Sequence, residues 1–276
     1  MQPSQEQLRN QSAAAIIGGE FDPKEVLLPY QKRWIADDAQ LKIAEKSRRT
    51  GLTWAEAADA ALNGSMSVAA GGSDTFYVGT TKDMAREFID ACAMWAKAYH
   101  YAASEVSEEA FDDEDKDILV YVINFASGFK IKALSSNPSN LRGMQGNVII
   151  DEAAFQKDLA AVLKAALALT MWGSKVRLIS THNGIENLFN TLIQDSRAGK
   201  KRFSIHSIDI DTAVREGLYR RICQVSKKPW SQAAEDEWLA NLLKDTATEE
   251  DAREEYYCQP RGGGGAYLPR GLRERA

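Results

Sequence analysis

The sequence predicts an α/β protein, with a mainly parallel sheet flanked by helices and a small helical subdomain after it. Between residues 41 and 208, short apolar runs rich in β-branched residues alternate with longer segments of helical period. Strands that alternate with helices of this length form parallel sheets covered on both faces. From Asp209 onward the chain is charged and helical in period, without a convincing strand.

The core of the chain contains the runs that predict strands. They are residues 41–45, 75–80, 118–124, 129–134, 147–151, 176–180 and 202–208. The segments of helical period between them are TWAEAADAALNG, TKDMAREFIDACAMWAKAYHYAA, DLAAVLKAALAL and NLFNTLIQDSR. Only the turn sequence FASG separates 118–124 from 129–134, which predicts an antiparallel hairpin within the parallel pattern.

The same patterns divide the chain into parts. Residues 1–26 predict a flexible N-terminal tail, and residues 27–208 contain the α/β core. Residues 209–260 predict the helical subdomain, and residues 261–276, which begin with RGGGG, are typical of a flexible linker. Because so few residues follow this linker, we expect a further domain to lie outside this sequence.

Composition favours a soluble globular protein of the cytosol. Of the 276 residues, 44% are hydrophobic and 26% are charged. No apolar run approaches the roughly 20 residues that a membrane span needs. The N-terminus lacks the segments of a secretory signal, and the scattered cysteines are typical of reduced thiols.

The net charge of −5 argues against a protein that coats nucleic acid through its bulk charge. The charges are unevenly spread, because residues 104–117 are strongly acidic whereas residues 197–202, RAGKKR, carry no acid. The acidic run predicts a solvated loop, since its acids are consecutive and not convergent. The basic segment predicts either a DNA-facing patch or a solvated loop; its charged residues are Arg197, Lys200, Lys201 and Arg202.

A candidate phosphate-binding loop follows the first predicted strand. Residues 46–53, KSRRTGLT, resemble in outline the pattern G-x-x-x-x-G-K followed by Ser or Thr. Gly51 and Thr53 fit this pattern, whereas Lys46 replaces the first glycine and Leu52 replaces the lysine. Backbone N–H groups at a helix N-terminus attract phosphate, and a hydroxyl at Thr53 suits Mg²⁺. Taken alone, the segment fits an ordinary turn better.

Two further strands end in polar residues. NVIIDEAAF ends a buried run in Asp151 and Glu152, where Asp151 suits Mg²⁺ and Glu152 suits a general base. The structural alternative requires nearby cations, because paired carboxylates are costly to leave unpaired. The strand 176–180 leads into STHN, a segment that could sense a γ-phosphate or simply cap a turn; its residues are Ser180, Thr181, His182 and Asn183.

In this order and spacing, KSRRTGLT, NVIIDEAAF and STHNG resemble the ATPase motor of tailed-bacteriophage large terminase subunits. The resemblance covers roughly residues 27–260. It implies a P-loop NTPase fold of the type with an additional strand and a catalytic glutamate. It also implies that ATP and Mg²⁺ bind, and that residues 209–260 form a lid subdomain ending in EEYYCQP.

The resemblance implies roles for further residues. LLPYQKRWI is similar to the family's adenine-side motif, in which Gln31 would read the adenine edge and Tyr30 would pack nearby. SSNPSNLRG resembles the segment that carries an arginine finger, here Arg142, which would reach the γ-phosphate of a neighbouring subunit. The family's coupling motif corresponds to residues 180–183, which would link hydrolysis to movement of the lid.

The resemblance also offers an explanation for the missing lysine. Some family members carry the basic residue at the start of the loop, and Lys46 fits that placement. We expect Lys46 to be the main replacement; Arg48 or Arg49 could instead clamp phosphate oxygens, and the ranking of these two arginines stays open. The nucleotide would also contact the rest of the loop, namely Ser47, Thr50, Gly51, Leu52 and Thr53.

The expected function is an ATP-hydrolysing motor that moves double-stranded DNA into a procapsid. Its expected partners are DNA, a portal protein, a small terminase subunit and further copies of this chain in a ring. We expect it in the cytoplasm of the infected bacterial host, neither in a membrane nor as a stable part of the virion. No nuclease is expected in this sequence. The alternatives are a helicase-like translocase and a catalytically inactive assembly scaffold.

Overall fold

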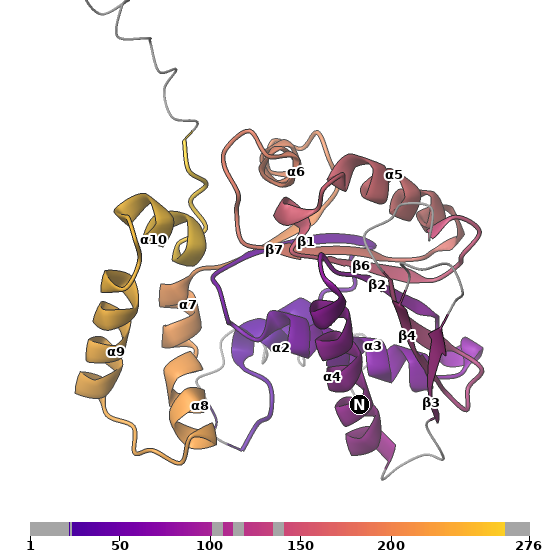
Figure 1. Ribbon diagram of the computed structural model, residues 1–276, viewed down its shortest axis with the longest axis horizontal. Helices are drawn as coiled ribbons and strands as arrows, with labels where there is room; N and C mark the ends of the chain where they lie inside the picture. Colours follow the sequence, from indigo (N-terminus) through magenta and orange to yellow (C-terminus); the bar gives the residue numbers. More distant parts are fainter. Residues whose placement is uncertain (1–21, 23, 101–106, 113–118, 135–140, 263–276) are drawn as a thin grey trace, which may run out of the picture.

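The computed structural model describes residues 22, 24–100, 107–112, 119–134 and 141–262 (Figure 1). Its centre is an eight-stranded sheet in the order β3-β4-β5-β2-β6-β7-β1-β8. The strands are β1 (Leu41–Lys46), β2 (Thr75–Val78), β3 (Ser107–Asp112), β4 (Leu119–Asn124), β5 (Lys130–Leu134), β6 (Asn147–Asp151), β7 (Val176–Ser180) and β8 (Ser204–Ile208).

Six neighbouring strands of this sheet, from β5 to β8 in the sheet order, run parallel. The strand β4 pairs antiparallel with β5, which confirms the predicted hairpin. The solvated loop predicted for residues 104–117 is wrong over residues 107–112, because these form β3 and pair antiparallel with β4. β3 is an edge strand, and edge strands commonly carry charged residues, so the acidic composition concealed a strand.

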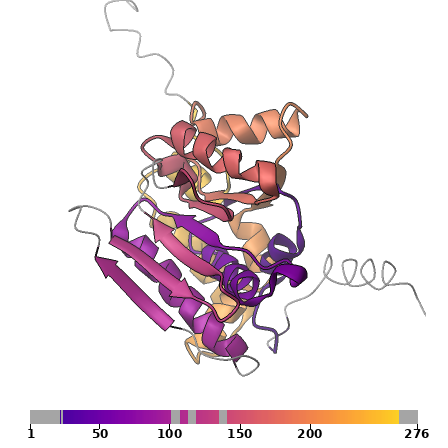
Figure 2. The ribbon, with the colours of Figure 1, turned by 90° about the vertical axis from the view of Figure 1, so that its right-hand side faces the viewer.

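Helices cover both faces of the sheet, as Figures 1 and 2 show. One face is covered by α2 (Pro29–Ala36), α3 (Leu52–Ser65) and α4 (Lys82–His100). The opposite face is covered by α5 (Leu159–Leu169) and α6 (Leu188–Arg197). Each face therefore has its own hydrophobic core, and the parallel sheet between them is buried on both sides.

The alternation of side chains along the strands produces these two cores. In β6, Ile149 packs into the α2–α4 core, whereas Val148 and Ile150 pack into the α5–α6 core. In β7, Ile179 packs into the α2–α4 core and Leu178 packs into the α5–α6 core. Successive side chains of a strand point to opposite faces of the sheet, and here both faces are buried. These strands therefore appear in the sequence as continuous apolar runs.

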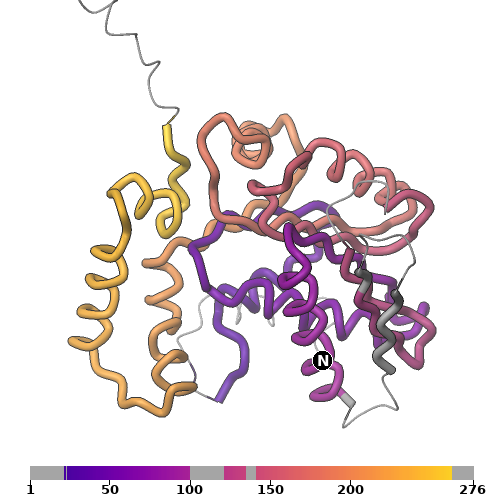
Figure 3. The backbone as a smooth tube through the Cα atoms, in the orientation of Figure 1, coloured from indigo at the N-terminus to yellow at the C-terminus, as the bar shows by residue number. Residues whose placement is uncertain are grey.

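Four helices follow the sheet, namely α7 (Ile210–Arg215), α8 (Leu218–Val225), α9 (Gln232–Lys244) and α10 (Glu249–Tyr256). The tube in Figure 3 shows them, in orange to yellow, at the left of the view, to one side of the α/β core. Side-chain caps begin three of them, at Asp209, Ser231 and Thr248. The predicted helical character of 209–260 therefore agrees with the structure.

The predicted tail (1–26) and linker (261–276) lie mostly outside the described residues. Across the described ranges, every helix is too short or too polar to cross a membrane.

Candidate functional site

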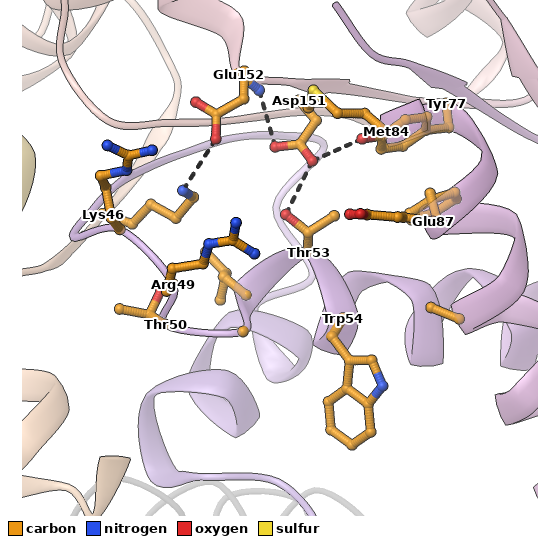
Figure 4. A pocket seen from close by; sticks show the side chains of 15 residues that line it. Lys46, Arg49, Thr50, Thr53, Trp54, Tyr77, Met84, Glu87, Asp151 and Glu152 are labelled. Carbon is orange, nitrogen blue, oxygen red and sulfur yellow. Dashed lines mark hydrogen bonds and ion pairs between the residues drawn. The ribbon is translucent and has the colours of Figure 1, made fainter. Parts of the chain in front are cut away.

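A cavity of about 410 Å³ lies where β1 and β6 end (Figure 4). The loop between β1 and α3, the Asp151–Glu152 pair after β6, and the first turns of α4 line it. Ligands of open parallel sheets bind beyond the carboxyl ends of the strands, which is where this cavity lies. The two strongest motifs of the sequence, residues 46–53 and Asp151–Glu152, therefore meet in one place.

The loop between β1 and α3 contains two residues with positive φ. Gly51 caps α3 with a φ of 70°, and Arg49 also has a positive φ of 56°. A Cβ at Gly51 would lie 3.0 Å from Gln31 Nε2, in a backbone region that L-residues rarely adopt. Gly51 is therefore required by the turn. Leu52 is 1% exposed and packs into the α2–α4 core. The position at which other such loops carry lysine is therefore filled here by a core side chain.

Two side chains of helix α2 support this loop through hydrogen bonds to its carbonyl groups. Tyr30 Oη donates a hydrogen bond to the carbonyl of Thr50 at 2.6 Å, and Gln31 Nε2 donates to the carbonyl of Gly51 at 2.9 Å. The other end of the Gln31 amide, Oε1, accepts from the Leu28 backbone N–H at 2.8 Å. Neither Tyr30 nor Gln31 lines the cavity, and both support the loop. The predicted adenine contacts of Tyr30 and Gln31 remain untested.

The basic residues of the loop differ in their partners. Lys46, at the end of β1, is buried, and its Nζ lies 3.5 Å from Glu152 Oε1. Arg48 Nε lies 3.3 Å from Glu255 Oε2 in α10, so this arginine connects the loop to the helical subdomain. Arg49 lines the cavity and has no ion-pair partner among the residues that the structure describes. Of these three basic residues, Lys46 is the one that pairs with Glu152.

Asp151 is the most constrained carboxylate of the cavity. Its Oδ2 accepts hydrogen bonds from Thr53 Oγ1 at 3.0 Å and Tyr77 Oη at 2.8 Å. Its Oδ1 accepts from the Glu152 backbone N–H at 2.9 Å. Burial raises the pKa of the Asp151 carboxyl, although the charge of Lys46 opposes this shift. Burial and the nearby Asp151 also raise the pKa of Tyr77, which remains a hydrogen-bond donor.

These oxygen atoms fit a magnesium ion. Mg²⁺ prefers hydroxyl, carboxylate, water and phosphate oxygens, and Thr53 and Asp151 bring two such donors together at one point. A divalent cation there would stabilise the ionised form of the Asp151 carboxyl, which burial disfavours. In the described part of the chain, no cluster of three or more His, Cys, Asp or Glu side chains could hold a metal by itself. The remaining ligands would therefore come from water and a bound phosphate.

Glu152 faces the cavity from a backbone conformation that is rare for its residue type. Its φ is 44°, in the left-handed region, which costs energy for a residue other than glycine. One carboxylate oxygen lies near Lys46, and the other accepts a long hydrogen bond from Ser180 Oγ at 3.5 Å. The carboxylate is therefore held at the mouth of the cavity, between a cation and a hydroxyl group.

Residues 180–183, at the end of β7 and directly after it, connect the segment 152–154 to β1. Ser180 Oγ accepts a hydrogen bond from the Ala154 backbone N–H at 3.1 Å, and Asn183 Nδ2 donates to the Ala154 carbonyl at 3.3 Å. Thr181 is buried between them. His182 Nε2 lies 2.9 Å from Glu45 Oε2. None of the four residues lines the cavity, and Ser180 contacts it through the hydrogen bond to Glu152.

Glu45 is a buried carboxylate that sequence reasoning missed, because it lies inside an apolar strand. It is paired with His182 from the segment after β7, with Arg197 from α6 and with Ser207 from β8. Burial raises its pKa, but the hydrogen bonds and the charge of Arg197 outweigh burial and lower the pKa overall. Tyr77 was missed for a similar reason, since its aromatic ring marked it only as a core residue.

The structure separates the remaining predicted residues from the cavity. Arg142 is exposed before β6, does not line the cavity, and has no ion pair within the described ranges. Arg197 forms an ion pair with Glu45, and Lys200 Nζ lies 3.4 Å from Asp195 Oδ1. Within the basic segment, only Lys201 and Arg202 are exposed without an ion pair to any described residue.

Comparison with known families decides the assignment. Residues 43–275 match the family described as the N-terminal part of the terminase large subunit, T4-like virus type. The chain belongs to the terminase large-subunit family. It is 69% identical over 256 residues to the Mu-like prophage FluMu protein gp28 of Haemophilus influenzae, and covers 50% of that protein. It is 53% identical over 264 residues to a probable terminase large subunit, gp28 of Escherichia phage Mu, and covers 48% of it. These alignments include 93% and 94% of the chain, which spans about half the length of these relatives.

Solved terminase structures share this fold. The large terminase ATPase domain of Thermus phage P74-26 has a TM-score of 0.55 at 18% identity, covering 94% of this chain and 99% of that domain. The HK97 large terminase gives 0.56 at 14% identity, with coverage of 91% and 55%. A large terminase of a thermophilic bacteriophage in complex with ADP gives 0.57 at 12% identity, with coverage of 84% and 53%. The predicted P-loop NTPase fold is confirmed, and β7, between β1 and β6, is its additional strand.

Proposed function

We propose that this terminase chain is the ATP-hydrolysing motor domain that drives double-stranded DNA into a procapsid. The observation that carries the proposal is the convergence of Lys46, Thr53, Asp151 and Glu152 on one cavity at a helix N-terminus. A structural relative with the same fold was solved with ADP, which supports nucleotide as the ligand. The other expected partners are a portal protein, a small terminase subunit and further copies of the chain.

Nucleotide phosphates would bind over the loop 47–53. The first N–H groups of α3 lack partners within the helix, and they would donate to phosphate oxygens. Lys46 and Arg49 supply positive charge on two sides of this loop. Thr53 and Asp151 would hold Mg²⁺, which when bound offsets the negative charge of the transferring phosphoryl group.

Hydrolysis would proceed by in-line attack of water on the γ-phosphorus atom, with ADP as the leaving group. The Glu152 carboxylate would accept the proton of the attacking water as the P–O bond forms. Lys46 Nζ lies 3.5 Å from one oxygen of that carboxylate, and Ser180 Oγ donates to the other oxygen. Arg142, which does not line its own cavity, would act on the site of a neighbouring subunit.

The proposed lid contacts both nucleotide-site loops. The Gly184 backbone N–H, next to the segment 180–183, donates to Glu254 Oε1 of α10 at 2.5 Å. Glu255, the next residue of α10, forms an ion pair with Arg48 of the loop between β1 and α3. Helix α10 therefore touches both loops whose environment changes when ATP is hydrolysed. These contacts support coupling between residues 180–183 and movement of residues 209–260.

The inactive scaffold, suggested by Leu52, is the alternative that needs an experiment. ATP hydrolysis should be measured for the chain with and without double-stranded DNA and its assembly partners. We expect turnover that DNA stimulates. Absence of turnover in the assembled complex would favour the scaffold. A helicase-like translocase is disfavoured because the chain belongs to the terminase family.

We expect Lys201 and Arg202 to contact the DNA backbone. The double variant Lys201→Gln, Arg202→Gln should reduce the slope of log K against log salt by about 1–2, since each phosphate contact contributes about 0.9. The measurement is DNA affinity at several salt concentrations, with Lys97→Gln, Lys164→Gln as a control of equal charge change. An unchanged slope in the first variant would show that the segment is only a solvated loop.

A further inference from the structure

Helix α4 places a third carboxylate in the cavity. The Glu87 side chain lines it, and Figure 4 shows it pointing from α4 towards Thr53, on the side opposite the phosphate loop. Among the described residues, Glu87 has neither an ion pair nor a side-chain hydrogen bond. It therefore differs from Asp151, which accepts three hydrogen bonds, and from Glu152, which lies beside Lys46.

The position of Glu87 is fixed by its neighbour in the helix. The Phe88 ring stacks on the Tyr77 ring at a centroid distance of 4.0 Å and an interplanar angle of 11°. The hydroxyl of the same tyrosine donates to Asp151 Oδ2. Phe88 is also buried in the α2–α4 core. The contacts from Phe88 through Tyr77 to Asp151 therefore fix the backbone of α4 at Glu87 relative to Asp151.

The charge of Glu87 requires a cation once a nucleotide is bound. The Glu87 side chain is exposed, and a carboxylate that faces bound phosphates is repelled by them. Of the cations at the cavity, Lys46 lies at Glu152 and Arg48 at Glu255, and Arg49 lies in the phosphate loop, on the side opposite Glu87. A cation that enters with the nucleotide, between Glu87 and Thr53, would compensate this charge.

We propose that Glu87 is a positioning residue for the hydrated Mg²⁺ of the nucleotide, beside Thr53 and Asp151. Mg²⁺ keeps several of its waters in protein sites, and carboxylates commonly hold it through those waters. Thr53, Asp151 and Glu87 come from α3, β6 and α4 and present oxygen atoms to the same part of the cavity. This inference rests on the proposed nucleotide function of the cavity.

The test compares ADP binding with and without Mg²⁺, measured by titration of a fluorescent ADP analogue into the full chain. In wild type, Mg²⁺ should increase the affinity for ADP. In Glu87→Gln, this gain should fall by about tenfold or more, in the range found for residues that hold metal ligands. Affinity for metal-free ADP should stay equal or rise, because a negative charge facing the phosphates has been removed.

Asp90→Asn is the matched control, since Asp90 lies on the same helix, outside the cavity, and pairs with the exposed Arg86. It should bind ADP as wild type does. A Glu87→Gln chain with the wild-type Mg²⁺ gain would overturn the inference. The inference would also be overturned if only turnover of the assembled motor fell, because Glu87 would then serve a neighbouring subunit. If wild type binds no ADP, the proposed function itself fails.

Discussion

Replacing Arg142 with alanine is expected to lower ATP turnover of the assembled motor by roughly 10³–10⁵-fold. An arginine finger stabilises charge on the transferring phosphoryl group, so its loss removes that stabilisation from the transition state. Because Arg142 is exposed and does not line its own cavity, ADP binding by the isolated chain should be unchanged. Arg86→Ala, another exposed arginine, is the control.

Mixing two inactive variants tests whether Arg142 acts in trans. In a ring that contains both Arg142→Ala and Glu152→Gln subunits, some sites combine an intact Glu152 with an intact Arg142 from the neighbour. Turnover should therefore reappear on mixing, although each variant alone is inactive. If Arg142 acted within its own subunit, no site in the mixed ring would be complete and turnover would stay absent.

Replacing Glu152 with glutamine is expected to lower turnover by about 10²–10⁴-fold, the usual contribution of a general base. The amide has the size of the carboxylate but cannot accept the proton of water. ADP binding should persist or tighten, because Lys46 is no longer paired with a negative charge at 3.5 Å. Turnover and ADP affinity are measured together, so that loss of chemistry is separated from loss of binding.

Glu186→Gln provides the matched control, because Glu186 is an exposed carboxylate outside the cavity. It should retain wild-type turnover. If Glu152→Gln also kept wild-type turnover in the assembled motor, Glu152 would not be the base. The strained φ of 44° at this residue would then need another explanation.

The sequence predicted the parts of the fold that depend on periodicity and strand order. β6 and β7 are continuous apolar runs because both faces are buried, and the FASG turn predicted the hairpin of β4 with β5. β3 was missed because its acidic composition suggested solvent, whereas the strand pairs through its backbone at the sheet edge. Backbone pairing of an edge strand leaves little trace in hydrophobic pattern.

The candidate site was predictable where residues adjacent in sequence carry the chemistry. Asp151 and Glu152 are consecutive, so a strand end presents both at one edge of the sheet. The partners brought from elsewhere were not predictable, because Tyr77, Glu45 and Glu87 lie on separate elements. Only the packing of α4 against β2 and the pairing of β1 with β7 and β8 place these residues near the loop.

The phosphate loop shows how the structure sharpened one of these predictions. Leu52 occupies the position of the usual lysine and is buried in the core, so a cation there would disturb packing. Arg48 pairs with Glu255 of α10, whereas Lys46 lies 3.5 Å from Glu152 and Arg49 lines the cavity without an ion pair to any described residue. The position of Lys46 fits the expectation that it replaces the usual lysine, and its contact with phosphate stays a prediction.

A structure of the chain with Mg²⁺ and a non-hydrolysable ATP analogue would show directly whether this cavity holds ATP in the proposed way. We expect the phosphates to lie over the N–H groups of residues 50–53. We also expect Lys46 Nζ to contact the β- or γ-phosphate and the Glu152 carboxylate to face the γ-phosphate. An analogue bound outside this cavity, or bound here with only Arg48 and Arg49 at the phosphates, would contradict the proposed site.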